Sequence, residues 1–230
     1  MTTHTPNLQT LWPTPILHTT LPDHHDVNAD LLDLFARHRD THPGPQGNVY
    51  SSGDDLLQRY DHPALKHLFS FVSRSVFEVA QTVNASAWAA LPDLRLQMRV
   101  VGAWFQIQNR YGFHDIHTHG NCSWSGVYYV QIDDTAERAR HPHLGTRNGI
   151  TRFYGPNLTL LGGAYQDLGN AYMQQVHHDV QPESGTLIVF PSWLNHKALP
   201  YDGQKDRVIV SFNAQVHGQS GNQTAGYGFA

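Results

Sequence analysis

The apolar residues from Leu94 onward alternate with polar ones, a period of two that is typical of half-buried β-strands. The first such run contains Leu94, Leu96, Met98 and Val100. Residues 101–102, Val-Gly, break its phase, which indicates a β-bulge or turn before the alternation resumes over residues 103–108. Further strand-like runs, separated by turns, are Thr151–Tyr154, Asn157–Leu161, Met173–Val180, Thr186–Phe190 and Arg207–Asn213. So many short strands predict a β-sandwich or jelly roll.

The residues before Leu94 mostly follow a helical period instead. Residues 11–22, bracketed by prolines, are expected to form an edge strand, and residues 40–53 a loop. Asn28 is expected to cap a helix whose apolar face contains Leu31, Leu34, Phe35 and His38. A longer helix is predicted from Pro63, with a stripe of Leu65, Leu68, Phe69, Val72, Val76, Val79 and Val83. These helices are expected to pack on one outer face of the sheets.

Composition narrows the class of protein further. The chain has 230 residues, of which 40% are hydrophobic and 15% charged, which predicts one globular domain without a membrane span. No secretory signal is visible, and a single cysteine, Cys122, excludes an internal disulfide, so a cytoplasmic location is expected. The formal charge of −4 argues against a nucleic-acid partner.

Two histidines, His117 and His119, precede the apolar run Gly126–Val130. In an extended backbone, residues two apart point to the same face, so both imidazoles can bind one metal ion. Seventeen histidines would give about one such pair by chance, and His141 and His143 form a second pair. The pair His117 and His119 is distinguished from a chance pair by a possible third ligand downstream, His196, at the end of the segment PSWLNH. Three imidazoles suit Fe(II), Zn, Cu or Ni, and open positions would mark a catalytic site.

Arg207 begins the strand-like run RVIVSFN. In an alternating strand it shares a face with Ile209, Ser211 and Asn213. An arginine on the inner face of a β-barrel requires an anion, and its planar group fits a carboxylate. The alternative is a position on the outer rim of the strand, with the guanidinium in solvent.

The motifs H-x-H, SGVYYV, FPSWLNH and RVIVSFN follow LWPTP in this order. This arrangement resembles a 2OG-Fe(II) oxygenase family in the double-stranded β-helix superfamily of Fe(II)/2-oxoglutarate dioxygenases. The resemblance implies an α+β, mainly β fold: a double-stranded β-helix (jelly roll) with N-terminal helices on one outer face. We expect a single domain, 1–230, in which an N-terminal strand and bracing helices occupy 1–90, the double-stranded β-helix core 91–216 and a C-terminal tail 217–230.

The resemblance assigns site residues as well. His117 and His196 correspond to the first and last ligands of the superfamily's metal triad, and His119 occupies the place where most members carry Asp or Glu. Asp115, two residues before His117, is an alternative carboxylate ligand, and Cys122 is a further candidate by proximity. Arg207 corresponds to the residue that pairs with the distal carboxylate of 2-oxoglutarate. Ser211, Tyr128 and Gln106 are additional candidates for binding the cosubstrate.

The implied activity is that of a dioxygenase that uses Fe(II), 2-oxoglutarate and O2, with hydroxylation of an unactivated C–H bond and release of succinate and CO2. The alternatives are a cupin-like three-histidine enzyme that does not use 2-oxoglutarate, and a non-catalytic metal-binding β-barrel. A small-molecule or amino-acid-like substrate is expected, and a homodimer is possible. Trp104 and Trp193 are further candidates for lining the pocket, and residues 133–149 are a candidate lid.

Overall fold

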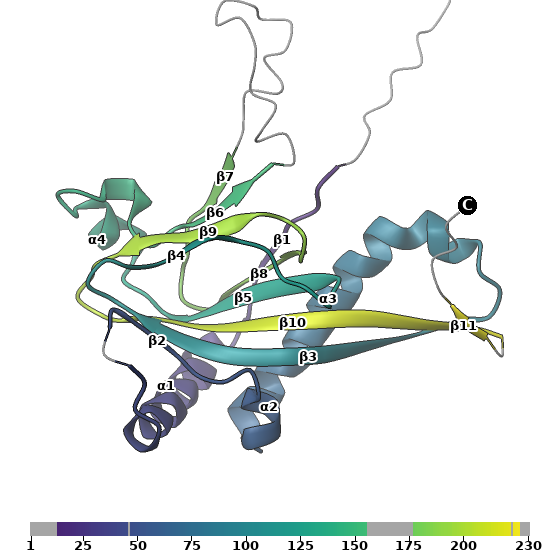
Figure 1. Cartoon of the computed structure of the whole chain (residues 1–230), viewed down its shortest axis with the longest axis horizontal. Coiled ribbons are helices and arrows are strands. Elements are labelled where there is room, and N and C mark those ends of the chain that lie inside the picture. The colour runs from purple at the N-terminus through teal and green to yellow at the C-terminus, as the bar shows by residue number, and fades with distance from the viewer. Residues whose placement is uncertain (1–12, 46, 156–176, 222, 226–230) are drawn as a thin grey trace, which may run out of the picture.

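Two antiparallel sheets face each other in the computed structural model, which describes residues 13–45, 47–155, 177–221 and 223–225 (Figure 1). The larger sheet contains β1 (Leu17–Thr20), β8 (Thr186–Pro191), β5 (Trp124–Gln131), β10 (Arg207–Ser220), β3 (Leu94–Gln108) and β2 (Val49–Ser51) in that order, with β11 (Gln223–Ala225) paired to β10. The smaller sheet contains β4 (Gly112–His117), β9 (His196–Tyr201), β6 (Thr151–Tyr154) and β7 (His177–Val180). The jelly-roll prediction is thereby confirmed, with β1 at an edge as expected.

Three helices cover the outer face of the larger sheet: α1 (His24–Thr41), α2 (Leu56–Arg59) and α3 (Pro63–Ala89) (Figure 1). The predicted apolar face of α1 is buried, but Asn28 does not cap this helix. Asn28 lies inside α1, and its side-chain oxygen accepts a hydrogen bond from the Tyr128 hydroxyl at 2.7 Å. The polar side chain therefore has a tertiary partner, which a local capping pattern does not reveal.

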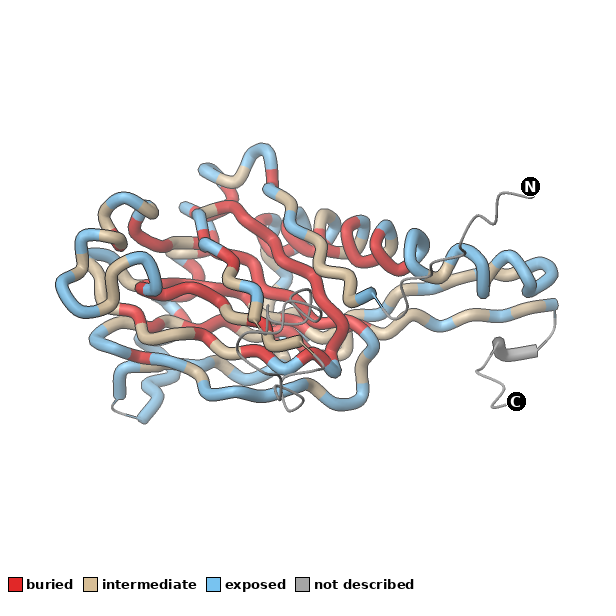
Figure 2. The backbone as a smooth tube through the Cα atoms, turned by 90° about the horizontal axis from the view of Figure 1, so that it is seen from above, coloured by how far each residue is buried: buried red, intermediate tan, exposed pale blue. Residues whose placement is uncertain are grey.

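The stripe on α3 is buried only as far as Ala80. Val83, predicted to be part of it, is 47% exposed. The last turns of α3 extend past the main body together with the outer parts of β3 and β10, so they have less sheet to cover (Figure 1, Figure 2). Pro63 begins the helix as predicted, and the expected loop at 40–53 contains the short strand β2.

The interruption at residues 101–102 is a bulge within one continuous strand. Gly102 pairs with Asn213 and Val100 with Ala214, so Val101 has no pairing partner on β10. A bulge increases the local twist of a strand without ending its ladder. The strand β3 thus runs from the two-sheet body into the projecting part of the molecule (Figure 2).

Apolar side chains form one cluster between the larger sheet and the helices and a second cluster between the two sheets. The strand β5 contributes to both, because successive side chains point to opposite faces. Tyr128 belongs to the helix side and Tyr129 to the space between the sheets. The second cluster is the smaller one, which leaves space between the sheets for polar side chains.

The candidate lid at 133–149 is folded as α4 (Thr135–Ala139) and a 3₁₀ turn (Gly145–Arg147). Its Arg138 is buried and donates hydrogen bonds to several backbone carbonyls, which fixes the segment in place. Residues 157–161 and 173–176, expected to be extended, lie outside the described residues. The subdivision of the chain at 90 and 217 stays a prediction, and β10 continues to Ser220. No helix among the described residues is long and apolar enough to cross a membrane.

Candidate metal centre

Three histidines predicted from the sequence lie together at one end of the space between the sheets. His117 is the last residue of β4 and His196 the first of β9, and the two are directly opposite each other in this antiparallel pair. His119 follows β4, and its backbone N–H donates to the Ser192 carbonyl at 2.9 Å. One ring nitrogen from each of the three histidines lies within 4.8 Å of the others.

Backbone carbonyls fix the orientation of two of these rings. The Nδ1 atom of His117 lies 2.7 Å from the Asp115 carbonyl oxygen, and that of His196 lies 2.9 Å from the Leu194 carbonyl oxygen. Because a carbonyl can only accept, both Nδ1 atoms carry a hydrogen, and the neutral form of each ring has its lone pair on Nε2. Metal-binding histidines commonly donate their second ring N–H in this way. This donor set therefore fits a divalent transition metal.

Burial favours the neutral form of the two inner imidazoles. Desolvation is the main cause, and together with the neighbouring His117 it lowers the pKa of His196 to about 3 and that of His119 to about 4. Both side chains are consequently neutral near pH 7. A neutral imidazole can bind a metal ion without first losing a proton.

The alternative ligands Asp115 and Cys122 do not join this group. Across the described ranges, only the three histidines form a set of three or more potential ligands close enough to share an ion. One oxygen of the exposed Asp115 carboxylate accepts instead from the N–H of Ile116, and the Cys122 sulfur lies 3.7 Å from the Ser125 hydroxyl. The geometry thus favours His119 over Asp115.

Arg207 lies deep between the sheets and is 1% exposed, so the alternative position on an outer rim is wrong. Its Nη1 atom donates to the side-chain oxygen of Gln108, and its Nη2 atom lies 3.5 Å from the Tyr129 hydroxyl. The guanidinium carbon is 5.1 Å from the centre of the Tyr129 ring. No carboxylate of the described residues forms an ion pair with it, and its Nε atom has no hydrogen-bond partner. A buried charge without a counter-ion is unfavourable unless a ligand supplies one.

One pocket, with a cavity volume of about 70 Å³, connects the histidines with Arg207. The side chains that line it come from both sheets: Trp104, Gln106, His114, His117, His119, Gly126, Val127, Thr151, Phe190, His196, Ala198, Arg207, Ile209 and Ser211. Gln106, Ser211 and Trp104 therefore lie where the sequence predicted. Ile209, on the same face of β10, lies between Arg207 and Ser211 in the chain.

Two predicted residues are not in this pocket. Tyr128 points toward the helices, and the neighbouring Tyr129 is the tyrosine close to Arg207. The sequence contains a signal for this, because Val127 and Tyr129 share one face of an alternating strand and Tyr128 lies on the other. Trp193 is 55% exposed and does not line the pocket. No sequence motif indicated His114, Tyr129 or Thr151 as residues of this site.

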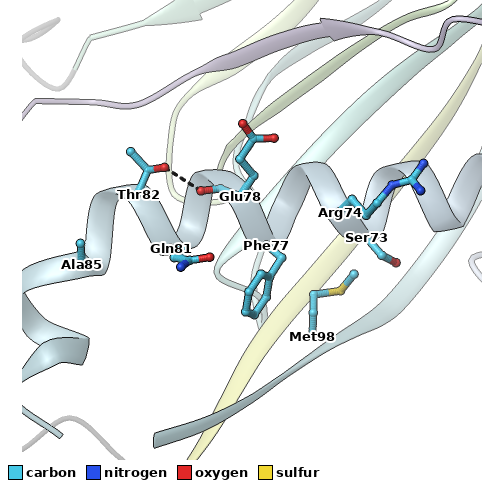
Figure 3. A pocket seen from close by; sticks show the side chains of 8 residues that line it. All are labelled: Ser73, Arg74, Phe77, Glu78, Gln81, Thr82, Ala85 and Met98. Carbon is cyan, nitrogen blue, oxygen red and sulfur yellow. Dashed lines mark hydrogen bonds between the residues drawn. The ribbon is translucent and has the colours of Figure 1, made fainter.

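A second and larger cavity, of about 700 Å³, lies between α3 and β3 (Figure 3). Phe77 points from the helix toward the strands, and Met98 lies on the β3 side. Its other lining side chains are Ser73, Arg74, Glu78, Gln81, Thr82 and Ala85, and they are exposed or half-buried. This cavity contains no cluster of potential metal ligands among the described residues, so its size does not make it the reactive site.

Comparison with known proteins agrees with this geometry. Residues 102–213 match the family model described as "Putative 2OG-Fe(II) oxygenase", and this stretch contains all three histidines and Arg207. The predicted resemblance is confirmed, and the predicted cofactors, Fe(II) and 2-oxoglutarate with O2, are those of this family. No functionally curated protein matches the chain.

Several solved structures share the fold. A prolyl-4-hydroxylase from Pseudomonas putida is 17% identical, with 87% of this chain and 92% of that chain covered and a TM-score of 0.50. HygX from Streptomyces hygroscopicus, solved with nickel and 2-oxoglutarate, is 13% identical, with coverage of 88% and 82% and a TM-score of 0.56. The epimerase SnoN from nogalamycin biosynthesis is 14% identical, with coverage of 94% and 84% and a TM-score of 0.54. At these identities the likeness shows the double-stranded β-helix fold alone.

Proposed function

We propose that this 2OG-Fe(II) oxygenase hydroxylates an unactivated C–H bond of a small-molecule or amino-acid-like substrate and converts 2-oxoglutarate to succinate and CO2. The observation that carries the proposal is one pocket with three converging imidazoles at one side and, at another, a buried arginine that forms no ion pair with any carboxylate of the described residues. The names of the structural neighbours support both the proposed hydroxylation and the proposed class of substrate. One is named a prolyl-4-hydroxylase, and HygX and SnoN have been solved with hygromycin B and nogalamycin RO respectively.

In this proposal His117, His119 and His196 hold Fe(II). When bound, Fe(II) together with 2-oxoglutarate and O2 supplies the oxidising chemistry. The protein supplies three neutral nitrogen donors, two of them oriented by backbone carbonyls. Three neutral ligands leave a net charge of +2 on the ion, whereas a triad with one carboxylate leaves +1. The three-histidine centre therefore attracts an anionic cosubstrate more strongly than a centre with one carboxylate ligand does.

Arg207 binds the distal carboxylate of 2-oxoglutarate. Its guanidinium is held by the oxygen of Gln108 and by the face of the Tyr129 ring, neither of which neutralises the charge. A carboxylate would provide the missing charge and an acceptor for the unpartnered Nε–H. Ser211 and Gln106 line the same pocket and can contribute polar contacts to the cosubstrate.

Part of the pocket wall is apolar. Val127, Phe190 and Ile209 belong to the cluster between the sheets. The exposed His117 and half-buried Trp104 lie on the more open part of the pocket lining. A substrate would therefore approach from the side of the histidines, while the buried arginine keeps the cosubstrate in place behind them.

Anaerobic reconstitution with Fe(II) and 2-oxoglutarate tests this proposal. The wild-type protein is expected to develop the weak visible charge-transfer band of the chelate and, once air is admitted, to form succinate. Arg207→Ala should bind the metal but lose 2-oxoglutarate binding, while Arg99→Ala, an exposed arginine on β3, should keep both. No band and no succinate at saturating cosubstrate would instead favour the cupin-like enzyme or the non-catalytic barrel. Mass analysis of the product would separate hydroxylation from epimerisation or ring closure.

A further inference from the structure

Three buried side-chain atoms in the described part of the chain have no hydrogen-bond partner: Nε of Arg207, Nε2 of Gln108 and Nε2 of His114. Buried polar atoms are nearly always paired, because an unpaired one is costly. The side chains of Arg207 and Gln108 contact each other, and His114 lines the same pocket as Arg207. The unsatisfied atoms therefore belong to one region of the protein.

The backbone around His114 directs this side chain inward. His114 lies on β4 opposite Ala198, and the register of the pair shifts on both sides of it, between Gly112 and His114 and between His114 and His117. Such irregularities change the direction of a side chain without ending the strand. Phe113, the residue before His114, is 51% exposed, whereas the Nε2 atom of His114 is buried.

His114 occupies a position close to both functional ends of the pocket. Its ring centre is 6.3 Å from that of His117. Burial, followed by the nearby positive charge of Arg207, lowers the pKa of His114 to about 4. The ring is thus neutral near pH 7, and when its proton is on Nε2 it can donate one hydrogen bond without adding charge.

The unsatisfied atoms can all act as donors. Gln108 uses its oxygen to accept from Arg207, which leaves its NH₂ group free, and Arg207 offers Nε–H. A group of donors around one positive charge fits an anion with several acceptor sites, and a carboxylate has about four. A single guanidinium satisfies only some of these sites.

We propose that the Nε2–H group of His114 donates a hydrogen bond to the distal carboxylate of 2-oxoglutarate, as a cosubstrate-binding residue beside Arg207 and the Gln108 amide. The inference rests on the proposed function, since it requires 2-oxoglutarate to bind in this pocket. It adds a contact from β4, in the smaller sheet, to those that β10 and β3 supply from the larger one. The cosubstrate would then hold the two sheets together.

The test is calorimetric titration of 2-oxoglutarate into Ni(II)-loaded protein, with Ni(II) affinity measured separately. His114→Phe keeps a ring of similar size but has no donor, and it should weaken 2-oxoglutarate binding about tenfold or more. His114→Gln can reach the same point with an amide N–H and should remain within about threefold of wild type. Ni(II) affinity should change less than about twofold in both variants. The control His18→Phe, exposed on β1, should change neither quantity.

Equal 2-oxoglutarate affinity of wild type and His114→Phe would overturn the inference and leave the proposed function intact. Absence of binding to the wild-type protein would instead overturn the proposed function. If His114→Phe does not fold, wild-type protein labelled with ¹⁵N-histidine and loaded with Zn(II) provides the answer. Addition of 2-oxoglutarate should shift the Nε2 resonance of His114, assigned from its loss in His114→Gln, and an unchanged resonance would contradict the contact.

Discussion

Arg138 and Arg207 lie in different regions and are both almost completely buried, but their hydrogen-bond partners differ. Arg138 lies in residues 133–149, the α4 segment, and is 2% exposed, and Arg207 between the sheets is 1% exposed. The guanidinium of Arg138 donates at 2.7 to 3.0 Å to the carbonyls of Asp133, Asn148 and Pro182 and to the Thr135 hydroxyl. Arg207 has one amide oxygen, a distant hydroxyl and an unpartnered Nε.

The difference is the one expected between an arginine that stabilises the fold and one that binds a ligand, the role proposed for Arg207. Every nitrogen of the Arg138 guanidinium has an oxygen acceptor, so the side chain joins its own helix, the following loop and residue 182 into one unit. Among the described residues Arg207 has no carboxylate partner and its Nε has no acceptor, which supports the proposal that a bound carboxylate supplies both. Burial alone would rank the two arginines equally, whereas the number of satisfied donors distinguishes them.

The largest expected effect follows from replacing each arginine with methionine, which has similar length and no charge. Arg138→Met should lower the free energy of unfolding by about 3–5 kcal/mol, because several buried carbonyls lose their donor. Arg207→Met should change it by less than about 1 kcal/mol, because an uncompensated charge is removed at the same time. Urea denaturation of the metal-free proteins measures both. Similar losses in the two variants would contradict the distinction.

A histidine from each region provides the next comparison. His196→Ala should weaken Ni(II) binding at least hundredfold, since it removes a ligand and not only a supporting contact. His141→Ala should leave Ni(II) binding unchanged, because its Nε2 lies 3.1 Å from Asp202 near α4 and outside the triad. Calorimetry in a non-chelating buffer measures both constants. A comparable loss in His141→Ala would locate the metal elsewhere.

The pH dependence of stability should come from the pocket. The pKa values of His119 and His196 are about 4 and 3 in the folded protein, below the ordinary value of 6.5. Between the folded pKa values and 6.5, the unfolded chain binds more protons at these histidines than the folded protein does. The metal-free protein should therefore lose stability as the pH falls from about 6.5 toward 4. His119→Gln should make that loss smaller. Urea midpoints at pH 7, 6 and 5 measure the slope, and an identical slope in the variant would exclude this contribution.

The smallest effect is expected on the surface of the α4 segment. Arg140 forms a 2.9 Å ion pair with Glu137, and its side chain is largely exposed. Arg140→Ala should change the free energy of unfolding by less than about 0.5 kcal/mol, because exposed ion pairs contribute little. Thermal unfolding of this variant beside Arg138→Met would show whether burial and satisfied donors determine the contribution of an arginine. A loss as large as that of Arg138→Met would contradict this view.

Sequence patterns predicted the elements whose signal is local. The strand alternation, the buried face of α1 and the start of α3 at Pro63 depend on neighbouring residues, and the structure agrees with them. The spacing of the histidines identified a set that the fold brings together. The motif around Arg207 likewise identified a side chain that is buried in the same pocket.

The residues whose positions were predicted incorrectly, or not predicted, are positioned by contacts between distant parts of the chain. Tyr128 and Tyr129 differ only in phase, and the pairing of Ile209 with Tyr129 determines which one lies near Arg207. Asn28 resembles a helix cap but is the partner of Tyr128. His114 has no motif of its own, because the irregular pairing of β4 with β9 directs it into the pocket. Val83 continues a periodic stripe beyond the sheet surface that the stripe covers.

We propose above all that the three imidazoles and Arg207 form one binding pocket. A crystal structure of the anaerobic Fe(II) protein soaked with 2-oxoglutarate would test this directly. Anomalous data collected at the iron edge would locate the ion. We expect a single anomalous peak about 2.1 Å from Nε2 of His117, His119 and His196, and a carboxylate of the cosubstrate on Arg207. An iron peak bound to Asp115 in place of His119, or a cosubstrate that does not reach Arg207, would contradict it.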